Sequence, residues 1–341
     1  MGSIVTLGEM LLRLKSQDNL RLFQTNKLES TFGGGEVNMA VSLSLLGAST
    51  RFVTALPDNI IGDSCINELH KYQIDTTSIV RTGKRVGIYY LEAGANQRAT
   101  KVIYDRQDSS ISHVTHDVFN WDAVFQNASW FIISGITPAL SESAAELTVK
   151  AVDEAKSRGI HVCLDFNHRK NLWNYGKNIE EVMRPLVKKV NVIIAGTLDC
   201  QQTLGVPLDS GRIKGDLNME ELKQLTSKVM ATYDLSGIAI TKRDNVSANI
   251  NNWTAFYNCD EGFYTSTEYR INNIVDRVGG GDSFTAGLIY GLNYLNSPKE
   301  ALDFATAFSC LKLSCMGDFN LTTRDDVLAL ISGDISGRIL R

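Results

Sequence analysis

The 341-residue chain lacks the features that mark several classes of protein. It has no apolar run close to the roughly 20 residues that a membrane-spanning helix needs, so we expect no membrane partner. Residues 1–5 lead straight into an apolar segment without a charged region and long apolar stretch of the leader type, and we therefore expect no signal peptide. The formal net charge is −4 and no basic run is present, which argues against nucleic acid as a partner.

Cysteine is scarce and shows no paired spacing. The six cysteines stand at positions 65, 163, 200, 259, 310 and 315, with no metal-type pair among them. Most lie in apolar runs, a pattern typical of buried free thiols in a reducing compartment, so we expect a cytoplasmic protein. The chain also lacks linkers, repeats and low-complexity tracts, and we expect a single domain over residues 1–341.

The chain does have the composition and periodicity of a globular α/β protein. Hydrophobic residues make up 43% of it, which is enough for a large core. Apolar runs predict strands at residues 4–7, 51–55, 130–133, 161–166, 190–195 and 238–241. Helical spacing predicts helices at residues 36–46, 60–70, 141–158, 220–233, 283–295 and from 298 to a stop at Gly317. This alternation predicts a mostly parallel sheet covered by helices on both faces.

Two segments interrupt this alternation. Residues 12–32 and 86–106 are polar and extended, and the second has strand-like alternation at 88–91 and 101–104. We expect the two segments to form a small β-sheet apart from the main one. Because an exposed sheet needs a cover, we expect it to act as a lid over a ligand and as the contact of a homodimer or a higher homo-oligomer.

A glycine-rich stretch, residues 276–284, carries the clearest chemical signal. Gly279, Gly280 and Gly281 run directly into a segment of helical periodicity, so we expect a loop that opens a helix at about Asp282. Free backbone N–H groups and the helix dipole suit such a junction to a phosphate. A carboxylate there repels the phosphate, so one role for Asp282 is that of a base toward an attacking hydroxyl. The alternative is a tight turn with Asp282 as a helix cap.

A second glycine-rich entry to a helix lies at residues 33–35. A dinucleotide-binding loop would follow a buried strand, whereas this one follows a polar segment, so we do not favour a nicotinamide-dependent dehydrogenase. We expect Gly34 and Asn38 to bring backbone and an amide close to the hydroxyl groups of a polar ligand.

Polar residues also end two of the predicted strands. Alternation places Asp165, Asn167 and Arg169 on one side of the chain at the end of a buried strand. Ligands bind at the carboxyl ends of parallel strands, although ordinary loop polarity is the alternative. Lys242 and Arg243 end a later strand, where they would meet either a nucleotide phosphate or only solvent.

Taken together, these motifs resemble the ribokinase-like (PfkB-type) carbohydrate kinases over essentially the whole chain. The motifs, in order, are Gly8-Glu9, Gly33-Gly34 to Asn38, Leu46-Gly47, Asp58 to Gly62-Asp63, Asp165-x-Asn167-x-Arg169 and Asp276 to Asp282. Within the family the chain is most similar to 2-keto-3-deoxygluconate kinases, by Leu172-Trp173, Tyr104-x-Arg106, Asp276-Arg277-Val278 and Lys312 to Asn320. The resemblance implies a three-layer α/β fold with a mostly parallel central sheet between helices, plus a small β lid.

The resemblance also implies an activity: ATP- and Mg²⁺-dependent phosphorylation of 2-keto-3-deoxy-D-gluconate at its C6 hydroxyl. Asp282 would be the catalytic base, and Gly279, Gly280 and Gly281 would form the anion hole. The residues implied to face the sugar acid are Gly34, Tyr89, Tyr104, Arg106, Arg169 and Asp318. Those implied to face ATP are Asn167, Lys242 and Arg243. Arg106 would hold the carboxylate of the acid with its planar fork. Activation by a monovalent cation stays open.

Three positions depart from the family pattern. Gly196 and Asp199 stand where the family usually has Asn and Glu, so Asp199 is the residue expected to reach Mg²⁺, through a water. Asp244 replaces the glycine expected after Arg243. Two other interpretations stay open on this fold: a kinase of another sugar such as fructose, and a sugar-binding protein without catalytic activity.

Overall fold

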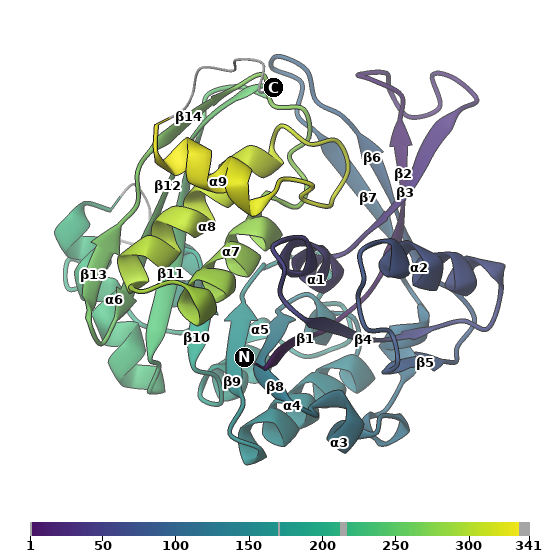
Figure 1. The fold of residues 1–341 in the computed structure, drawn as a ribbon, viewed down its shortest axis with the longest axis horizontal. Coiled ribbons are helices and arrows are strands. Elements are labelled where there is room, and N and C mark those ends of the chain that lie inside the picture. Colours follow the sequence, from purple (N-terminus) through teal and green to yellow (C-terminus); the bar gives the residue numbers. More distant parts are fainter. Residues whose placement is uncertain (1, 170, 212–216, 334–341) are drawn as a thin grey trace.

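The computed structural model describes residues 2–169, 171–211 and 217–333. Within these residues, ten strands form a central sheet (Figure 1). Nine of them lie in the spatial order β13 (Gly262–Thr265), β12 (Ile250–Cys259), β11 (Gly237–Asn245), β10 (Val192–Ile194), β9 (His161–Asp165), β8 (Ala128–Ser134), β1 (Ser3–Leu7), β4 (Thr50–Leu56) and β5 (Ile79–Arg81). The remaining strand, β14 (Tyr269–Asn272), pairs with β12.

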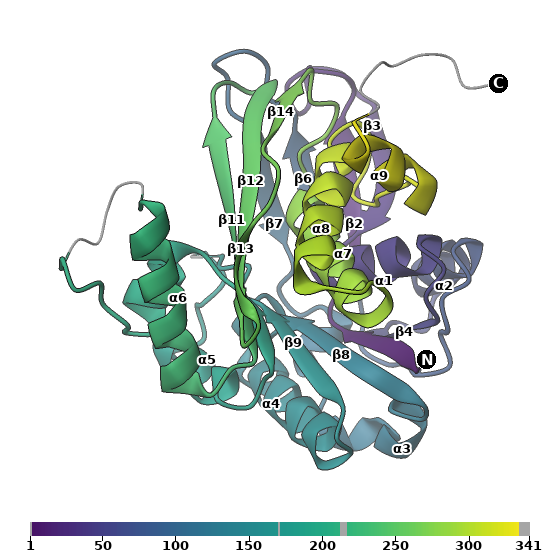
Figure 2. The same cartoon turned by 60° about the vertical axis from the view of Figure 1, so that its left-hand side comes forward.

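Helices cover both faces of this sheet (Figure 2). One layer contains α1 (Gly35–Leu45), α2 (Ile60–Lys71), α7 (Gly280–Tyr294), α8 (Pro298–Lys312) and α9 (Arg324–Ile331). The other contains α3 (Trp121–Val124), α4 (Glu142–Ser157), α5 (Ile179–Val187) and α6 (Met219–Tyr233). Short helical turns are η1 (Ser110–His113), η2 (His116–Val118), η3 (Thr137–Ala139) and η4 (Asp199–Thr203). None of the described helices is long and apolar enough to cross a membrane.

The central sheet is mostly parallel, as the sequence predicts. The strands from β11 across to β5 run parallel to their neighbours, whereas β12 pairs antiparallel with β11, β13 and β14. Residues of the buried strands alternate between two apolar layers: Trp130 and Ile132 of β8 pack with α7, and Phe131 and Ile133 pack with α4. Burial on both faces explains why these strands are continuous apolar runs in the sequence. The six cysteines are free, and three of them are buried.

The two polar segments form a second sheet, called here the small sheet. Its strands lie in the order β3 (Leu28–Gly33), β2 (Leu11–Ser16), β6 (Gly87–Glu92) and β7 (Lys101–Asp105). It stands to one side of the central sheet (Figure 1). Arg13 of β2 and Tyr89 of β6 lie opposite each other, and both side chains are buried. The face that carries these two residues is therefore the inner face of the small sheet.

Two helix ends differ from the sequence prediction. α7 begins at Gly280, two residues earlier than expected, because Gly279 alone takes the left-handed backbone conformation, with φ 85°. α8 ends at Lys312 rather than at Gly317. The buried Lys312 ammonium donates to the backbone oxygens of Cys315 and Gly317, and so holds these residues in a loop. Strands β5, β12, β13 and β14 and helices α3, α5 and α9 were not predicted.

Candidate active site

A cavity of about 980 Å³ lies between the carboxyl ends of β9 and β10, the second half of β11, the N-termini of α1 and α7, and the inner face of the small sheet. Every residue that the sequence singled out for the site lines this cavity: Gly34, Asn38, Tyr89, Tyr104, Arg106, Asn167, Arg169, Asp199, Lys242, Arg243, Gly279, Gly280, Gly281, Asp282 and Asp318. They come from both sheets, from the first turns of α1 and α7, from η4 and from loops. The fold therefore brings together groups that are far apart in the sequence.

The glycine loop supplies the N-terminus of α7 to the cavity. A Cβ on Gly279 would lie 2.0 Å from the backbone oxygen of Asp318, so only glycine permits this close approach. The Gly279 carbonyl accepts the first helical bond from the Ser283 N–H, at 2.9 Å. The N–H groups of residues 280–282 come before that bond and have no partner within the helix, and they lie at the positive end of its dipole. This is the geometry of an anion site.

Asp282 lies in the first turn of α7 and is 7% exposed. Its Oδ2 accepts from Asn38 Nδ2 at 2.7 Å, and its Oδ1 accepts from Asn167 Nδ2 at 3.3 Å. Burial raises the pKa of Asp282 to about 7, the Asn38 hydrogen bond opposes that rise, and the nearby Asp165 carboxylate adds to it. A carboxylate with a pKa near neutral pH is well matched to accepting a proton from a hydroxyl group.

The residues at the end of β9 serve different parts of the site. The Asp165 carboxylate accepts from Thr285 Oγ1 at 2.9 Å and from the Asn167 N–H at 3.1 Å, so it ties β9 to α7. Burial raises the pKa of Asp165 to about 6. β9 ends at Asp165, and Asn167 has a positive φ of 35°. A turn, rather than strand alternation, therefore brings Asn167 to Asp282. Arg169 is exposed at the edge of the cavity.

Arg106 is buried beside the cavity and already has a carboxylate partner. Its Nε and Nη2 lie 2.6 Å and 2.5 Å from Glu9 Oε2, and Glu9 is 3% exposed. The guanidinium also lies 5.4 Å from the centre of the Tyr104 ring, which is 6.2 Å from that of Tyr89. Glu9 offsets much of the arginine charge. The outer edge of the guanidinium therefore binds a ligand mainly through directed hydrogen bonds and less through net positive charge.

Lys242 and Arg243 lie within β11 rather than at its end, because the strand continues to Asn245 beside β12. The Arg243 guanidinium stacks on Trp253, 4.2 Å from the ring centre. A Cβ on Gly281 would lie 3.0 Å from Arg243 Nη2, so this cation borders the glycine loop. Lys242 Nζ lies 3.9 Å from an oxygen of Asp244, which reduces the positive charge on this side of the cavity.

Asp199 begins the short turn η4 and faces the cavity with a side chain that is 17% exposed. Its Oδ2 accepts from the Gly196 N–H at 2.9 Å, and His168 Nδ1 lies 3.4 Å from its Oδ1. Across the described ranges, no group of three His, Cys, Asp or Glu side chains could hold a metal ion. A single carboxylate suits a magnesium ion that arrives with nucleotide phosphates and keeps most of its waters.

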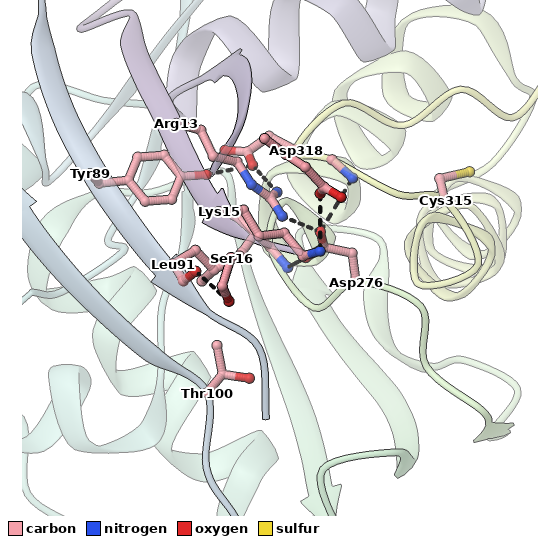
Figure 3. Close-up of polar contacts among 12 residues, drawn as sticks. Arg13, Lys15, Ser16, Tyr89, Leu91, Thr100, Asp276, Cys315 and Asp318 are labelled. Atoms are coloured by element: carbon pink, nitrogen blue, oxygen red, sulfur yellow. Dashed lines mark hydrogen bonds and ion pairs between the residues drawn. The ribbon is translucent and has the colours of Figure 1, made fainter. Parts of the chain in front are cut away.

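One charged residue of this region, Arg13, was not expected from the sequence. Its side chain is 1% exposed and forms ion pairs with Asp276 and Asp318, and the Tyr89 hydroxyl donates to Asp318 at 2.5 Å (Figure 3). The local signal is an arginine between Leu12 and Leu14, which alternation places on the opposite face from those leucines. No pattern in the sequence indicates which acids it meets.

Comparison with known proteins agrees with this geometry. The profile of the pfkB family of carbohydrate kinases matches residues 1–324. The chain is 37% identical to a 2-dehydro-3-deoxygluconokinase of known structure from Thermotoga maritima, over 98% of this chain and 100% of that one, with a TM-score of 0.92.

Two further relatives cover almost the whole chain. A PfkB family carbohydrate kinase from Listeria grayi is 32% identical over 97% of this chain and 99% of its own, with a TM-score of 0.88. A 2-dehydro-3-deoxygalactonokinase from Haloferax volcanii is 29% identical over 98% of each chain. The α/β architecture, the cavity lining and these matches lead to one conclusion: the chain belongs to the pfkB family of carbohydrate kinases.

Proposed function

We propose that this kinase transfers the γ-phosphoryl group of ATP to the C6 hydroxyl of 2-keto-3-deoxy-D-gluconate. The observation that carries the proposal is Asp282, a buried carboxylate with a pKa of about 7 in the first turn of a helix whose N-terminus is an anion site. The names of the Thermotoga and Haloferax relatives support a 2-keto-3-deoxy sugar acid as the substrate class.

In the proposed reaction the O6 atom of the sugar acid attacks the γ-phosphorus as Asp282 takes the hydroxyl proton. The bond between that phosphorus and the oxygen bridging to the β-phosphate breaks, and ADP leaves. The N–H groups of residues 280–282 stabilise the charge on the transferred group, because donors fixed in place before the reaction lower the barrier most. Asn38 and Asn167 orient the Asp282 carboxylate toward the sugar.

The nucleotide would occupy the side of the cavity near β11. Arg243, stacked on Trp253 beside Gly281, would face its phosphates, and Lys242 and Asn167 line the same region. Asp199 would hold Mg²⁺ through a water, and the ion would offset the charge of the β- and γ-phosphates. The homodimer, the lid movement and the cytoplasmic location stay predictions, and activation by a monovalent cation stays open.

The sugar acid would occupy the side under the small sheet. The outer edge of the Arg106 guanidinium would meet its carboxylate, with Arg169 as a second cation and the Tyr89 and Tyr104 rings alongside. Because Glu9 neutralises much of the charge of Arg106, Arg169 would supply more of the electrostatic attraction for the carboxylate. Closing the small sheet over the cavity would exclude water and limit the hydrolysis of ATP.

A coupled assay of ADP release tests the proposal. The substrates are 2-keto-3-deoxygluconate, its galactonate epimer, fructose and a buffer blank, each with Mg-ATP. We expect the highest kcat/KM for the gluconate acid. A preference for the galactonate epimer would change the stereochemistry assigned to the substrate. A preference for fructose would refute the proposal that the substrate is a sugar acid. If none of these sugars stimulates ADP release, the result would favour a sugar-binding protein without catalytic activity.

A further inference from the structure

Arg13 joins the small sheet to the body of the protein (Figure 3). Its guanidinium leaves the inner face of β2 and meets two carboxylates of the body: Nη1 donates to Asp318 Oδ1 at 2.6 Å, and Nη2 pairs with Asp276. Asp276 precedes the glycine loop, and Asp318 follows α8. The side chains of all three are at most 5% exposed. A buried arginine between the small sheet and these loops of the body is a fixed joint, since each charge lacks water as an alternative partner.

One branch of the joint reaches the sugar side of the cavity. Asp318 Oδ1 accepts from both Arg13 and the Tyr89 hydroxyl. A Cβ on Gly33 would lie 2.0 Å from Asp318 Oδ2, so the second oxygen points toward the glycine entry of α1. Burial raises the pKa of Asp318, and Arg13 opposes that rise. Arg13 therefore favours the ionised form of this carboxylate and holds it in place.

The other branch reaches the anion hole. Asp276 Oδ1 accepts from the Val278 N–H at 3.1 Å, and Val278 is the residue directly before Gly279. Asp276 Oδ2, the atom that pairs with Arg13, also accepts from the Gly317 N–H at 3.2 Å. Lys312 Nζ in turn donates to the Gly317 carbonyl at 2.6 Å. The backbone that leads into the glycine loop is thus held from Arg13 on one side and from Lys312 on the other.

We propose that Arg13 is a positioning residue for phosphoryl transfer. Through Asp276 it would hold the anion hole, and through its direct ion pair it would hold the sugar-facing Asp318, both in a fixed position relative to the small sheet. The role rests on the proposed function of this site, in which the glycine loop stabilises the transferred group. Arg13 touches neither reactant in this arrangement. Its loss would free the glycine loop and Asp318 to shift relative to each other, and a displacement of about 1 Å at such a site costs about 100-fold in rate.

The test compares Arg13→Gln, Arg13→Lys and a matched control, Arg98→Gln. Arg98 also belongs to the small-sheet region, but it pairs with Glu92 and the Asn19 carbonyl, within that region. We expect Arg13→Gln to lower kcat by about 100-fold. Arg13→Lys should recover only part of the loss, because a single ammonium cannot bridge two carboxylates in the manner of the guanidinium fork. Arg98→Gln should stay within about threefold of wild type.

Two further measurements separate positioning from loss of structure. Each variant is assayed well below its own unfolding temperature, and the KM for ATP should change far less than kcat. In Arg13→Ala, free guanidinium at millimolar concentration should restore part of kcat, whereas urea at the same concentration should not. If Arg13→Gln does not fold, Arg13→Lys decides: a kcat equal to wild type overturns the proposal, and a reduced kcat supports it.

The outcomes also separate this proposal from the proposed function. A wild-type protein that phosphorylates no sugar acid refutes the function. An active wild type, with a folded Arg13→Gln variant at wild-type kcat and no guanidinium effect, refutes the role of Arg13 and leaves the function standing.

Discussion

Replacing Asp282 by asparagine should remove most of the activity and, at neutral pH, make the folded protein more stable. Asparagine has the same shape, and its carbonyl oxygen can still accept the Asn38 hydrogen bond that Asp282 Oδ2 accepts at 2.7 Å. It cannot accept the proton of the sugar hydroxyl. Loss of a general base lowers kcat by about 10²–10⁴, which is about 3–5 kcal/mol of barrier.

The expected gain in stability follows from the pKa of the same group. The pKa of Asp282 is about 7 in the folded protein and 3.8 for an ordinary aspartate. A carboxyl group whose pKa is raised by folding is protonated in both states at low pH and costs nothing there. As the pH rises from about 4 to about 7 the unfolded chain ionises first, so folding loses up to about 4 kcal/mol. Asparagine carries no charge and avoids this loss.

Two measurements check this reasoning. Urea denaturation at pH 8 should show a higher midpoint for Asp282→Asn than for wild type, and the difference should shrink toward pH 4.5. The wild-type kcat/KM should rise about tenfold per pH unit below pH 7 and level off above it, because only the ionised carboxylate accepts the proton. Near-wild-type turnover in a folded Asp282→Asn protein would remove Asp282 as the base. A variant that is less stable at pH 8 would show that the carboxylate is not desolvated.

The remaining predictions concern the acid end of the substrate and the small sheet. Arg106→Leu should raise the KM for the sugar acid by a factor that corresponds to a loss of about 2–5 kcal/mol in binding free energy, with little change in the KM for ATP. An unchanged KM for the sugar acid would contradict the role of Arg106 as the partner of its carboxylate. Because this change leaves the buried Glu9 unpaired, Glu9→Gln combined with Arg106→Leu is the control for folding. Light scattering should show a dimer of the wild type at micromolar concentration and a monomer of the Ile103→Glu variant. Ile103 is 55% exposed and lies opposite Tyr90 in the neighbouring strand, and Phe23, which contacts Tyr90, is 75% exposed, so the small sheet presents an apolar surface. A monomeric wild type would exclude the dimer.

Much of the fold was accessible from the sequence because its signals are local. Strands such as β8 are apolar runs buried on both faces, and α4 begins at Glu142, directly after Ser141, whose side chain caps the helix. The antiparallel strand β12 escaped prediction because its polar residues, such as Asn251 and Asn258, break the apolar run even though both are buried. A polar side chain that is buried by tertiary contacts leaves no local mark in the sequence.

The site residues fall into the same two groups, those with a local signal in the sequence and those without one. Gly279 and Asp282 were identified from a motif that combines close backbone approach with a helix start, and both line the cavity. The partners of the arginines were not accessible. Arg106 meets Glu9, which is 97 residues away in the chain, and Arg13 meets Asp276, which is 263 residues away. Charge pairing between distant segments depends on the completed fold, so the Glu9 partner of Arg106 was not expected, although Arg106 does line the cavity.

The pairing of β2 with β6 has a consequence for the order in which the protein assembles. Each half of the small sheet is antiparallel and local, but the halves meet in a parallel pair in which Leu11 lies opposite Gly87. The chain between them contains α1, β4 and α2, so closing this loop before the body exists carries a large entropic cost. We expect the small sheet to fold last and open first. In native-state hydrogen exchange, amides of β6 should then exchange at a lower denaturant concentration than those of β8. Equal protection would show that the small sheet and the central sheet unfold as one cooperative unit.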